Sequence, residues 1–191
     1  RTVSVASAIF DGETVIEDMK AVRIGSPKDL TYDRSRVSVL VDPEGRSISE
    51  LRPDILVDAI MAKKNLGTKR GMAPIVIGIG PGFSAPGEVD AVIETKRGHY
   101  LGRVIRNGSA IPNTGVPGII KGYTVERLLR SPGEGCVIPV KSIGDPVMPG
   151  DTVAHVECLP VCSQIEGIVR GLIHPSVKVK KGLKIGDIDP R

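Results

Sequence analysis

VMPGDTVAHV at residues 147–156 and VKKGLKIGDI at residues 179–188 decide how the C-terminal part of this 191-residue chain folds. The two stretches share the pattern V-x-x-G-x-x-[VI]-x-x-[VI], and their first residues are 32 positions apart (147 and 179). Each copy has the pattern of a short strand, a glycine turn and a second strand. Residues 159–169, between the copies, also have a strand–turn–strand pattern. The sequence therefore predicts duplicated hairpins around a central turn over about residues 140–191.

Duplicated hairpins of this kind resemble the barrel-sandwich hybrid fold of biotinyl and lipoyl carrier domains. A carrier domain of this type needs one exposed lysine at the tip of its central turn, because the cofactor is attached there as an amide. Residues 157–167 (ECLPVCSQIEG) contain no lysine. We therefore expect the barrel-like architecture without the carrier function.

Upstream of this repeat, the sequence first alternates between helical and strand patterns and then becomes strand-rich. A short helix is predicted at residues 47–51, where Ser47 and Glu50 have the spacing of a capping box. The nearly continuous apolar runs at residues 54–59 and 73–79 predict buried strands of the kind found in parallel sheets. Further strands are predicted at residues 89–95 and 102–106.

These patterns together predict a mixed α+β chain with two domains. Residues 1–70 are expected to form a partial α/β domain. Residues 71–191 are expected to form a β-rich domain that ends in the barrel-sandwich-like repeat.

Composition excludes several classes of protein. No apolar run approaches the roughly 18–20 residues that span a bilayer, so no membrane partner is expected. Only five aromatic residues are present and the net charge is +4, which argues against a nucleic-acid partner that binds by base stacking. The odd number of cysteines, three, does not make a disulfide framework, and no signal peptide is recognisable, so we expect a reducing cytoplasm.

A glycine-rich segment follows the predicted strand at residues 73–79. Gly78, Gly80 and Gly82 could present backbone N–H groups to an anion, as a phosphate-binding loop does. Pro81 removes one of these donors, and the segment matches neither a dinucleotide fingerprint nor a P-loop. A wide turn between strands is the alternative.

Lys63, Lys64 and Asn65 follow the predicted strand at residues 54–59. Ligands in open α/β sheets bind at the carboxyl ends of the strands, so these residues are candidates to hold a phosphate or carboxylate. A solvated loop is the alternative.

Glu94, Arg97, His99 and Arg103 lie within ten residues of one another on a predicted strand–turn–strand segment. Arg97, His99 and Arg103 are candidate contacts for an anionic cofactor, and His99 or Glu94 is a candidate general acid or base. A hairpin with ordinary exposed charges is the alternative.

One set of residues could be considered for a metal. His155, Cys158 and Cys162 carry suitable ligand atoms, but the x₃ spacing of the cysteines is atypical and no fourth ligand is near in sequence. We therefore predict no metal site and expect buried, unreactive thiols in a small barrel instead.

Longer motifs are more specific than any of these single sites. AKKNLGT at 62–68, MAPIVIGIGPGF at 72–83, VIETKRGHYLGR at 92–103 and IGDIDPR at 185–191 resemble the YqeB-type accessory proteins of selenium-dependent molybdenum hydroxylase systems. The resemblance covers essentially the whole chain. It also implies a Gly-rich, dinucleotide-binding strand–turn–helix ahead of Arg1 that this sequence does not contain. On this resemblance, residues 1–70 are expected to correspond to the second half of a Rossmann-like sheet.

The resemblance implies a role in maturing, or inserting the cofactor of, a selenium-dependent molybdenum hydroxylase. The implied ligand is an anionic cofactor, of molybdopterin or nucleotide type, and the implied partner is the hydroxylase apo-enzyme, with a homo-oligomer also considered. The alternative is a nucleotide-dependent enzyme, an oxidoreductase or transferase, that acts on a cofactor precursor.

Overall fold

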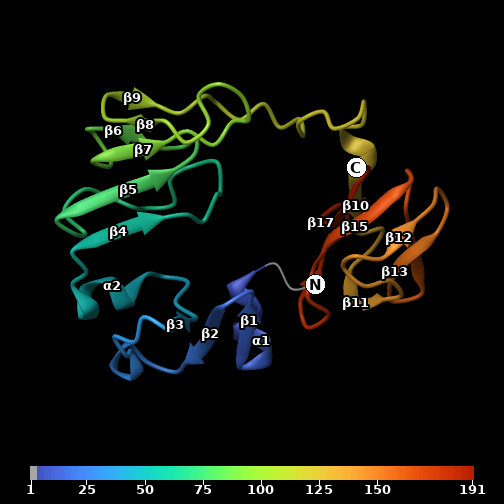
Figure 1. Cartoon of the computed structure of the whole chain (residues 1–191), viewed down its shortest axis with the longest axis horizontal. Helices are drawn as coiled ribbons and strands as arrows, with labels where there is room; N and C mark the ends of the chain where they lie inside the picture. Colours follow the sequence, from blue (N-terminus) through green and yellow to red (C-terminus); the bar gives the residue numbers. More distant parts are fainter. Residues whose placement is uncertain (1–3) are drawn as a thin grey trace. The chain divides into compact units, whose positions relative to one another are not determined.

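A computed structural model describes residues 4–191 and divides the chain into two compact units (Figure 1). One unit combines the described residues up to 41 with residues 117–191, and the other consists of residues 42–116. Both are built mostly from β-strands in several sheets, with few helices, which confirms the β-rich character predicted from the sequence. The predicted domain boundary near residue 70 falls inside the second unit, and the proposed two-domain division stays a prediction.

The first unit begins with short helical turns that contact a three-stranded sheet. β1 and β2 form an antiparallel hairpin, and β2 pairs in parallel with β3. Gly12 ends α1 with a positive φ of 84°, a conformation that glycine adopts without strain. The elements are η1 (Val5–Ser7), α1 (Ala8–Asp11), β1 (Glu13–Ile16), β2 (Met19–Ile24), η2 (Pro27–Asp29) and β3 (Arg36–Leu40).

The rest of the first unit contains two four-stranded sheets, with orders β10-β17-β15-β12 and β14-β13-β11-β16. All strand pairs within them are antiparallel, and one apolar core contains buried residues from both sheets. The elements are η3 (Val125–Arg127), β10 (Leu128–Arg130), β11 (Gly135–Pro139), β12 (Pro146–Val147), β13 (Thr152–Val156), β14 (Leu159–Cys162), β15 (Gly167–Leu172), β16 (Lys178–Val179) and β17 (Lys184–Asp189).

The two copies of the repeated pattern occupy corresponding places in these two sheets. The first copy supplies an edge strand, β12, and an inner strand, β13, and the second copy supplies the edge strand β16 and the inner strand β17. All six shared apolar positions are at most 2% exposed and lie in the same core: Val147, Val153, Val156, Val179, Ile185 and Ile188. The repeat therefore supplies half of the twelve buried residues of this core.

The second unit contains a four-stranded sheet of order β4-β5-β7-β8, in which β4, β5 and β7 run parallel and β8 is antiparallel. The elements are α2 (Arg46–Leu51), β4 (Ile55–Asp58), β5 (Ile75–Ile79), β6 (Ser84–Ala85), β7 (Ala91–Ile93), β8 (Val104–Ile105) and β9 (Gly108–Ser109). The connections from β4 to β5 and from β5 to β7 contain no helix. No helix among residues 4–191 is long and apolar enough to cross a membrane.

Helix α2 forms where the sequence predicted a helix, but its N-terminus is held by a different residue. The capping box of Ser47 and Glu50 is wrong, because Gly45 occupies the N-cap and makes no side-chain hydrogen bond. The carboxylate of Asp42 instead accepts hydrogen bonds from the backbone N–H of Arg46 at 3.0 Å and of Ser47 at 2.7 Å. A side chain upstream of the helix thus satisfies two of its free N–H groups.

The predicted burial of the strands at 54–59 and 73–79 holds for one face only. Val76 and Asp58 are 0% and 8% exposed, whereas Ile55, Val57 and Ile75 are 54%, 51% and 45% exposed. Successive residues of a strand point to opposite faces, so one face of this sheet packs against a core and the other is not covered within residues 42–116. The expectation that both strands are fully buried is therefore wrong in this structure.

We predict that Gly167→Ala destabilises the first unit by about 1–3 kcal/mol, the usual cost of overpacking. A Cβ at this position would overlap the backbone carbonyl oxygen of Asp189 on the paired strand, which cannot move aside as a side chain can. Urea unfolding measures the effect. Gly118→Ala is the matched control, because nothing lies within 4 Å of its Cβ position. Equal unfolding curves for the two variants would contradict the close approach of β15 and β17.

Candidate functional site

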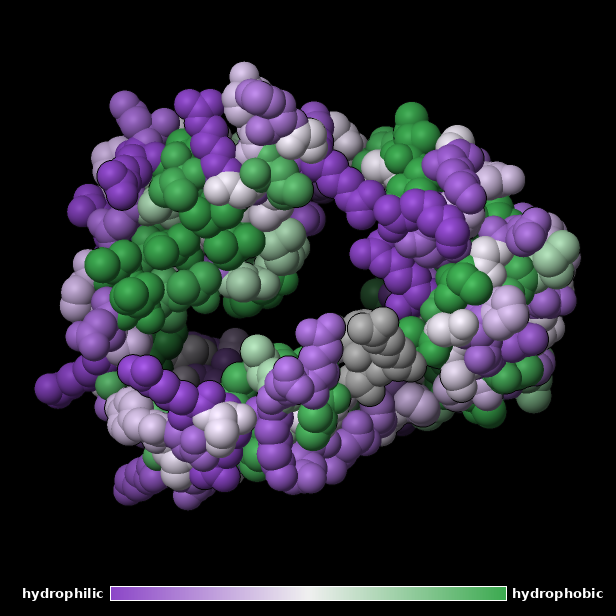
Figure 2. All heavy atoms as spheres, viewed as in Figure 1, coloured by the Kyte–Doolittle hydropathy of each residue, from purple (hydrophilic) through white to green (hydrophobic). Residues whose placement is uncertain are grey.

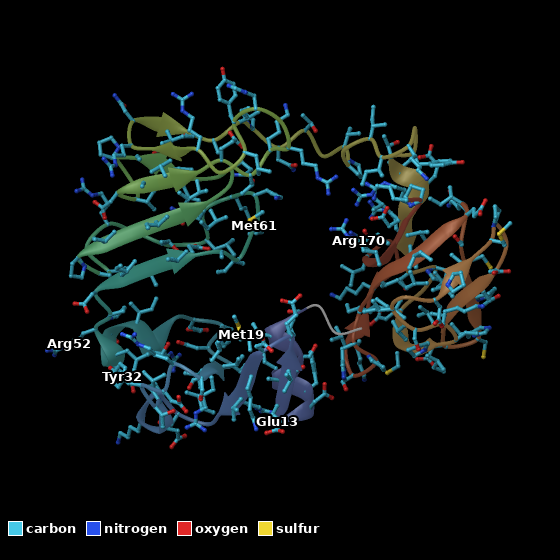
Figure 3. The ribbon with its side chains drawn as sticks, viewed as in Figure 1. Glu13, Met19, Tyr32, Arg52, Met61 and Arg170 are labelled. Atoms are coloured by element: carbon cyan, nitrogen blue, oxygen red, sulfur yellow. The ribbon has the colours of Figure 1, made fainter. Side chains whose placement is uncertain are left out.

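The residues singled out from the sequence for anion binding or catalysis all lie in the second unit. Gly78 lies within β5, and the others come after the carboxyl ends of the three parallel strands. Lys63 to Asn65 follow β4, Gly80 and Gly82 follow β5, and the segment from Glu94 to Arg103 follows β7. A Cβ on Gly82 would lie 2.6 Å from Lys64 Cα, and one on Gly80 would lie 2.8 Å from Thr95 Oγ1. The three loops therefore touch one another at one edge of the sheet, where Met61 is labelled in Figure 3.

The glycine-rich segment has structural reasons for its glycines. A Cβ on Gly78 would lie 2.5 Å from the ring of Phe83, so the absence of a side chain lets this ring pack on β5. Gly80 has φ of +87°, and its N–H donates to the carbonyl oxygen of Ile93 at 2.8 Å. With that donor used and Pro81 carrying none, the segment has few N–H groups for an anion. These observations favour the turn over the anion nest.

Asn65 holds its own loop. Its amide nitrogen donates to the Thr68 carbonyl oxygen at 2.9 Å and to Glu88 Oε1 at 3.0 Å. Its amide oxygen accepts from the N–H groups of Gly67 and Thr68, both at 2.8 Å. An asparagine side chain has two donors and two acceptor positions, so its hydrogen-bonding capacity is fully used. Lys63 and Lys64 remain exposed cations beside this loop.

Acidic side chains that sequence reasoning missed anchor the helix-free connections. Asp58 is 8% exposed and accepts from the Thr68 hydroxyl at 2.6 Å and from the Ile60 N–H at 3.1 Å. Asp90 accepts from the Val76 N–H at 2.8 Å and from Arg70 Nε at 2.7 Å. Their positions in the sequence could have identified these aspartates, because each lies at or beside the end of a strand.

The hydrogen bonds to Glu88 and Asp90 favour their charged forms. The Asn65 amide, followed by the hydroxyl and N–H of Ser84, lowers the pKa of Glu88 despite partial burial. The Val76 N–H is the main cause that lowers the pKa of Asp90, and Arg70 adds to it. Both carboxylates therefore act as fixed acceptors within the loops.

Glu94 is the most buried of the candidate site residues that carry an ionisable side chain, at 2% exposure. Its Oε1 accepts from the Lys96 N–H at 2.7 Å, and its Oε2 accepts from the Ile111 N–H at 2.8 Å. Burial raises the pKa of Glu94, but the backbone N–H groups of Ile111, Lys96 and Thr95 outweigh it, so the net pKa is lowered. A carboxylate stabilised in this way binds a proton weakly and makes a poor general base or acid near neutral pH.

A pocket of about 510 Å³ lies beside Glu94. Among the residues singled out from the sequence, only Glu94 and Arg103 line it. The polar or aromatic lining residues that sequence reasoning missed are Tyr100, Arg106, Asn107 and Ser109. The run from Arg106 to Ser109, which ends one strand and enters the next, was the signal that could have found three of them.

The pocket combines positive charge with one aromatic ring. The Arg103 guanidinium carbon lies 5.3 Å from the centroid of the Tyr100 ring, within the range of a cation–π contact. The His99 ring packs edge-on against the same Tyr100 ring, with 5.2 Å between the ring centroids. His99 does not line the pocket. Among the described residues, neither Arg103 nor Arg106 has an acidic salt-bridge partner. These arginines are therefore available to an anionic group.

The weak metal candidates do not assemble into a site. Among the residues that the structure describes, no group of three or more His, Cys, Asp or Glu side chains is placed to hold a metal ion. His155 therefore does not form such a group with Cys158 and Cys162. Cys158 and Cys162 are both exposed, so the expectation of buried thiols is wrong. Cys162 lies at the end of β14, where its Sγ is 3.8 Å from Thr152 Oγ1.

Comparison with curated proteins finds a relative that is similar in sequence. The chain is 46% identical over 192 aligned residues to an Escherichia coli (strain K12) protein described as "Uncharacterized protein YqeB", and the match covers 100% of this chain and 36% of that relative. The chain thus spans about a third of the length of the curated relative it matches. No protein-family model matches the chain.

Comparison with solved structures gives a partial match. An aspartoacylase family protein from Mesorhizobium loti is 23% identical, covers 39% of this chain and 28% of its own, and has a TM-score of 0.32. A TM-score this low carries no argument about fold or function.

We predict that Glu94→Gln destabilises the second unit by about 1–3 kcal/mol. The amide keeps one acceptor oxygen but turns an NH₂ group toward the second backbone N–H, so one partly buried N–H group loses its acceptor. Urea unfolding measures the effect. Glu50→Gln, at an exposed position of α2, is the matched control and should change stability little. A Glu94→Gln variant as stable as this control would show that the carboxylate does not hold the two N–H groups.

We also predict that stability of the second unit falls in acid. The folded-state pKa values of Glu88, Asp90 and Glu94 are lowered, so their contribution is complete above the unfolded-state pKa of about 4. It is lost as the pH falls through the lower folded-state values. Unfolding free energies measured between pH 6 and pH 2.5 should therefore decrease toward acid, and Glu88→Gln should make the decrease shallower. A stability that stays constant over this range would contradict the assignment.

Proposed function

Because the chain is YqeB-type in sequence along its whole length, we propose that it is an accessory protein for a selenium-dependent molybdenum hydroxylase. In this role it binds an anionic cofactor, of molybdopterin or nucleotide type, in a reducing cytoplasm. It also binds the hydroxylase apo-enzyme and promotes insertion of the cofactor. The sequence resemblance supports the biological setting, and the pocket of the second unit supports the ligand chemistry.

One observation carries the ligand part of the proposal: Arg103 and Arg106 line one pocket without acidic partners among the described residues. A guanidinium group donates paired hydrogen bonds to a phosphate, and two of them match a diphosphate or a phosphorylated side chain of a cofactor. Asn107 and Ser109 add polar groups to the same wall. The nearby carboxylate of Glu94 is held by backbone N–H groups, which reduces its repulsion of an anion.

These observations favour binding over the alternative of a nucleotide-dependent enzyme. The Glu94 carboxylate has a lowered pKa and is occupied by hydrogen bonds, and His99 does not line the pocket. Arg97, Lys63, Lys64 and the glycines lie outside the pocket lining as well. We therefore assign contacts with the ligand to Arg103 and Arg106. Asn65, Glu94 and the glycines are assigned to the structure of the neighbouring loops.

The finer description of the fold is also a proposal. The parallel strands β4, β5 and β7 support a Rossmann-like arrangement, since the candidate loops follow their carboxyl ends. The matching positions of β12–β13 and β16–β17 in two sheets support a barrel-sandwich hybrid in the first unit. The barrel-sandwich hybrid can form without a lysine at its central turn, and residues 157–167 contain none.

The test is complementation of a host strain from which the gene has been deleted. The molybdenum content of its purified selenium-dependent hydroxylase is measured with no protein, with the wild type, and with Arg103→Ala plus Arg106→Ala. We expect wild-type protein to restore full molybdenum content. We expect the double variant to restore at most about a tenth, because each lost charge-assisted contact weakens ligand binding by roughly tenfold or more.

Lys69→Ala is the matched control, since it removes an exposed positive charge of the same unit that does not line the pocket. It should restore molybdenum content as the wild type does. A hydroxylase that is fully loaded in the deletion strain would overturn the accessory role. Full restoration by the double variant would overturn only the assignment of the ligand to this pocket.

A further inference from the structure

The β4-β5-β7-β8 sheet has one apolar face that no other part of residues 42–116 covers fully. The register places residues of neighbouring strands opposite one another, so their side chains share this face. We call it the open face, and its members are Ile55, Val57, Ile75, Ile77, Ile79, Ala91, Ile93 and Val104. Figure 2 shows hydrophobic side chains gathered over these strands.

The exposure of the open face is large for isoleucine and valine. Ile55, Val57, Ile75 and Val104 are 54%, 51%, 45% and 54% exposed, while Ile77, Ile79 and Ile93 are partly buried. The opposite face packs on a core that includes Val76, Phe83, Val89 and Val92. A contiguous apolar patch of this kind marks an interaction surface, unlike single exposed apolar residues.

Parallel strands give a physical reason to expect a cover on this face. Parallel sheets are found almost entirely with both faces buried, usually beneath helices. Here the connections between β4, β5 and β7 contain no helix, and the core lies on one side only. The nearly continuous apolar runs at residues 54–59 and 73–79 are also typical of strands buried on both sides.

We propose that the open face is covered by a helical segment of the same polypeptide that lies outside residues 1–191. The curated relative is long enough to supply it, because this chain corresponds to only 36% of its length. The open face carries no charged residue, so the matching surface is the apolar stripe of an amphipathic helix. The β4 edge of the sheet is also unpaired among the described residues, which leaves room for the polypeptide to continue beside it. The proposal is independent of the accessory function.

Site-specific photo-crosslinking in the longest natural form of the protein tests the proposal. A benzophenone amino acid replaces Val57 on the open face, or Leu101 as a control with 59% exposure on a loop of the same unit. After irradiation, mass spectrometry maps the joined peptides. We expect Val57 to crosslink within one polypeptide to a segment outside residues 1–191, at a yield at least several times that of Leu101.

Three results would overturn the proposal. Crosslinks between two copies of the protein would assign the face to a homo-oligomer, and crosslinks to residues 4–41 or 117–191 would assign it to the other unit of this chain. A yield no higher than that of the Leu101 control would show that the face is bare.

A second measurement does not depend on crosslinking chemistry. In the same long form, Val57→Asp should lower the unfolding midpoint clearly, because a charge would be buried beneath the cover. Val116→Asp, at a position 63% exposed and outside the open face, should leave the midpoint nearly unchanged. A Val57→Asp protein as stable as this control would contradict burial of the face.

Discussion

The second unit depends on side-chain carboxylates that accept hydrogen bonds from backbone N–H groups of its strands and of the helix-free connections between them. Its parallel strands are joined by connections without helices, and a chain that passes close to a sheet cannot leave buried N–H groups without acceptors. Asp58, Asp90 and Glu94 each accept from at least one backbone N–H near the end of a strand. Glu88 does the same for Ser84. These hydrogen bonds hold the irregular connections in one conformation.

This arrangement separates the charges that build the unit from those that are free to bind a ligand. The carboxylates of Asp58, Glu88, Asp90 and Glu94 accept hydrogen bonds from backbone N–H groups. The hydrogen-bonding groups of the Asn65 side chain are used within its own loop and by Glu88. Arg103 and Arg106 remain at the wall of a pocket whose neighbouring carboxylate, Glu94, already has its partners. A positive pocket can thus exist in a unit with several acidic side chains, because most of that negative charge is paired with N–H dipoles.

The sequence predicted the positions of strands better than it predicted which other parts of the protein pack against them. The apolar spacing of the repeat placed Val147, Val153 and Val156 in the core together with their counterparts in the second copy, because strand periodicity depends on local sequence. The same reasoning failed for Ile55 and Val57, since an apolar run does not reveal whether a second layer covers it. It also failed for the cap of α2, where Asp42 lies farther from the helix than a capping box allows.

For the candidate site, too, the sequence predicted the region but not the contacts of individual side chains. Sequence reasoning found the right region, the loops after β4, β5 and β7, because strand ends are visible in the apolar pattern. It did not separate Arg103, which lines the pocket, from Arg97 and His99, which do not. It also took Asn65 and Gly82 as ligand contacts, whereas one is saturated by its loop and the other allows the backbone at Lys64 to approach. These distinctions depend on contacts between loops that are distant in sequence.

Amide hydrogen exchange, resolved by residue with NMR at neutral pH, tests the role of the carboxylates most directly. We predict that the N–H groups of Lys96 and Ile111, which donate to Glu94, exchange as slowly as amides inside β5. This should hold for Lys96 and Ile111 even though both residues are exposed. Exchange at Lys96 and Ile111 as fast as at the exposed residue Gly98 would show that the Glu94 carboxylate does not hold these N–H groups.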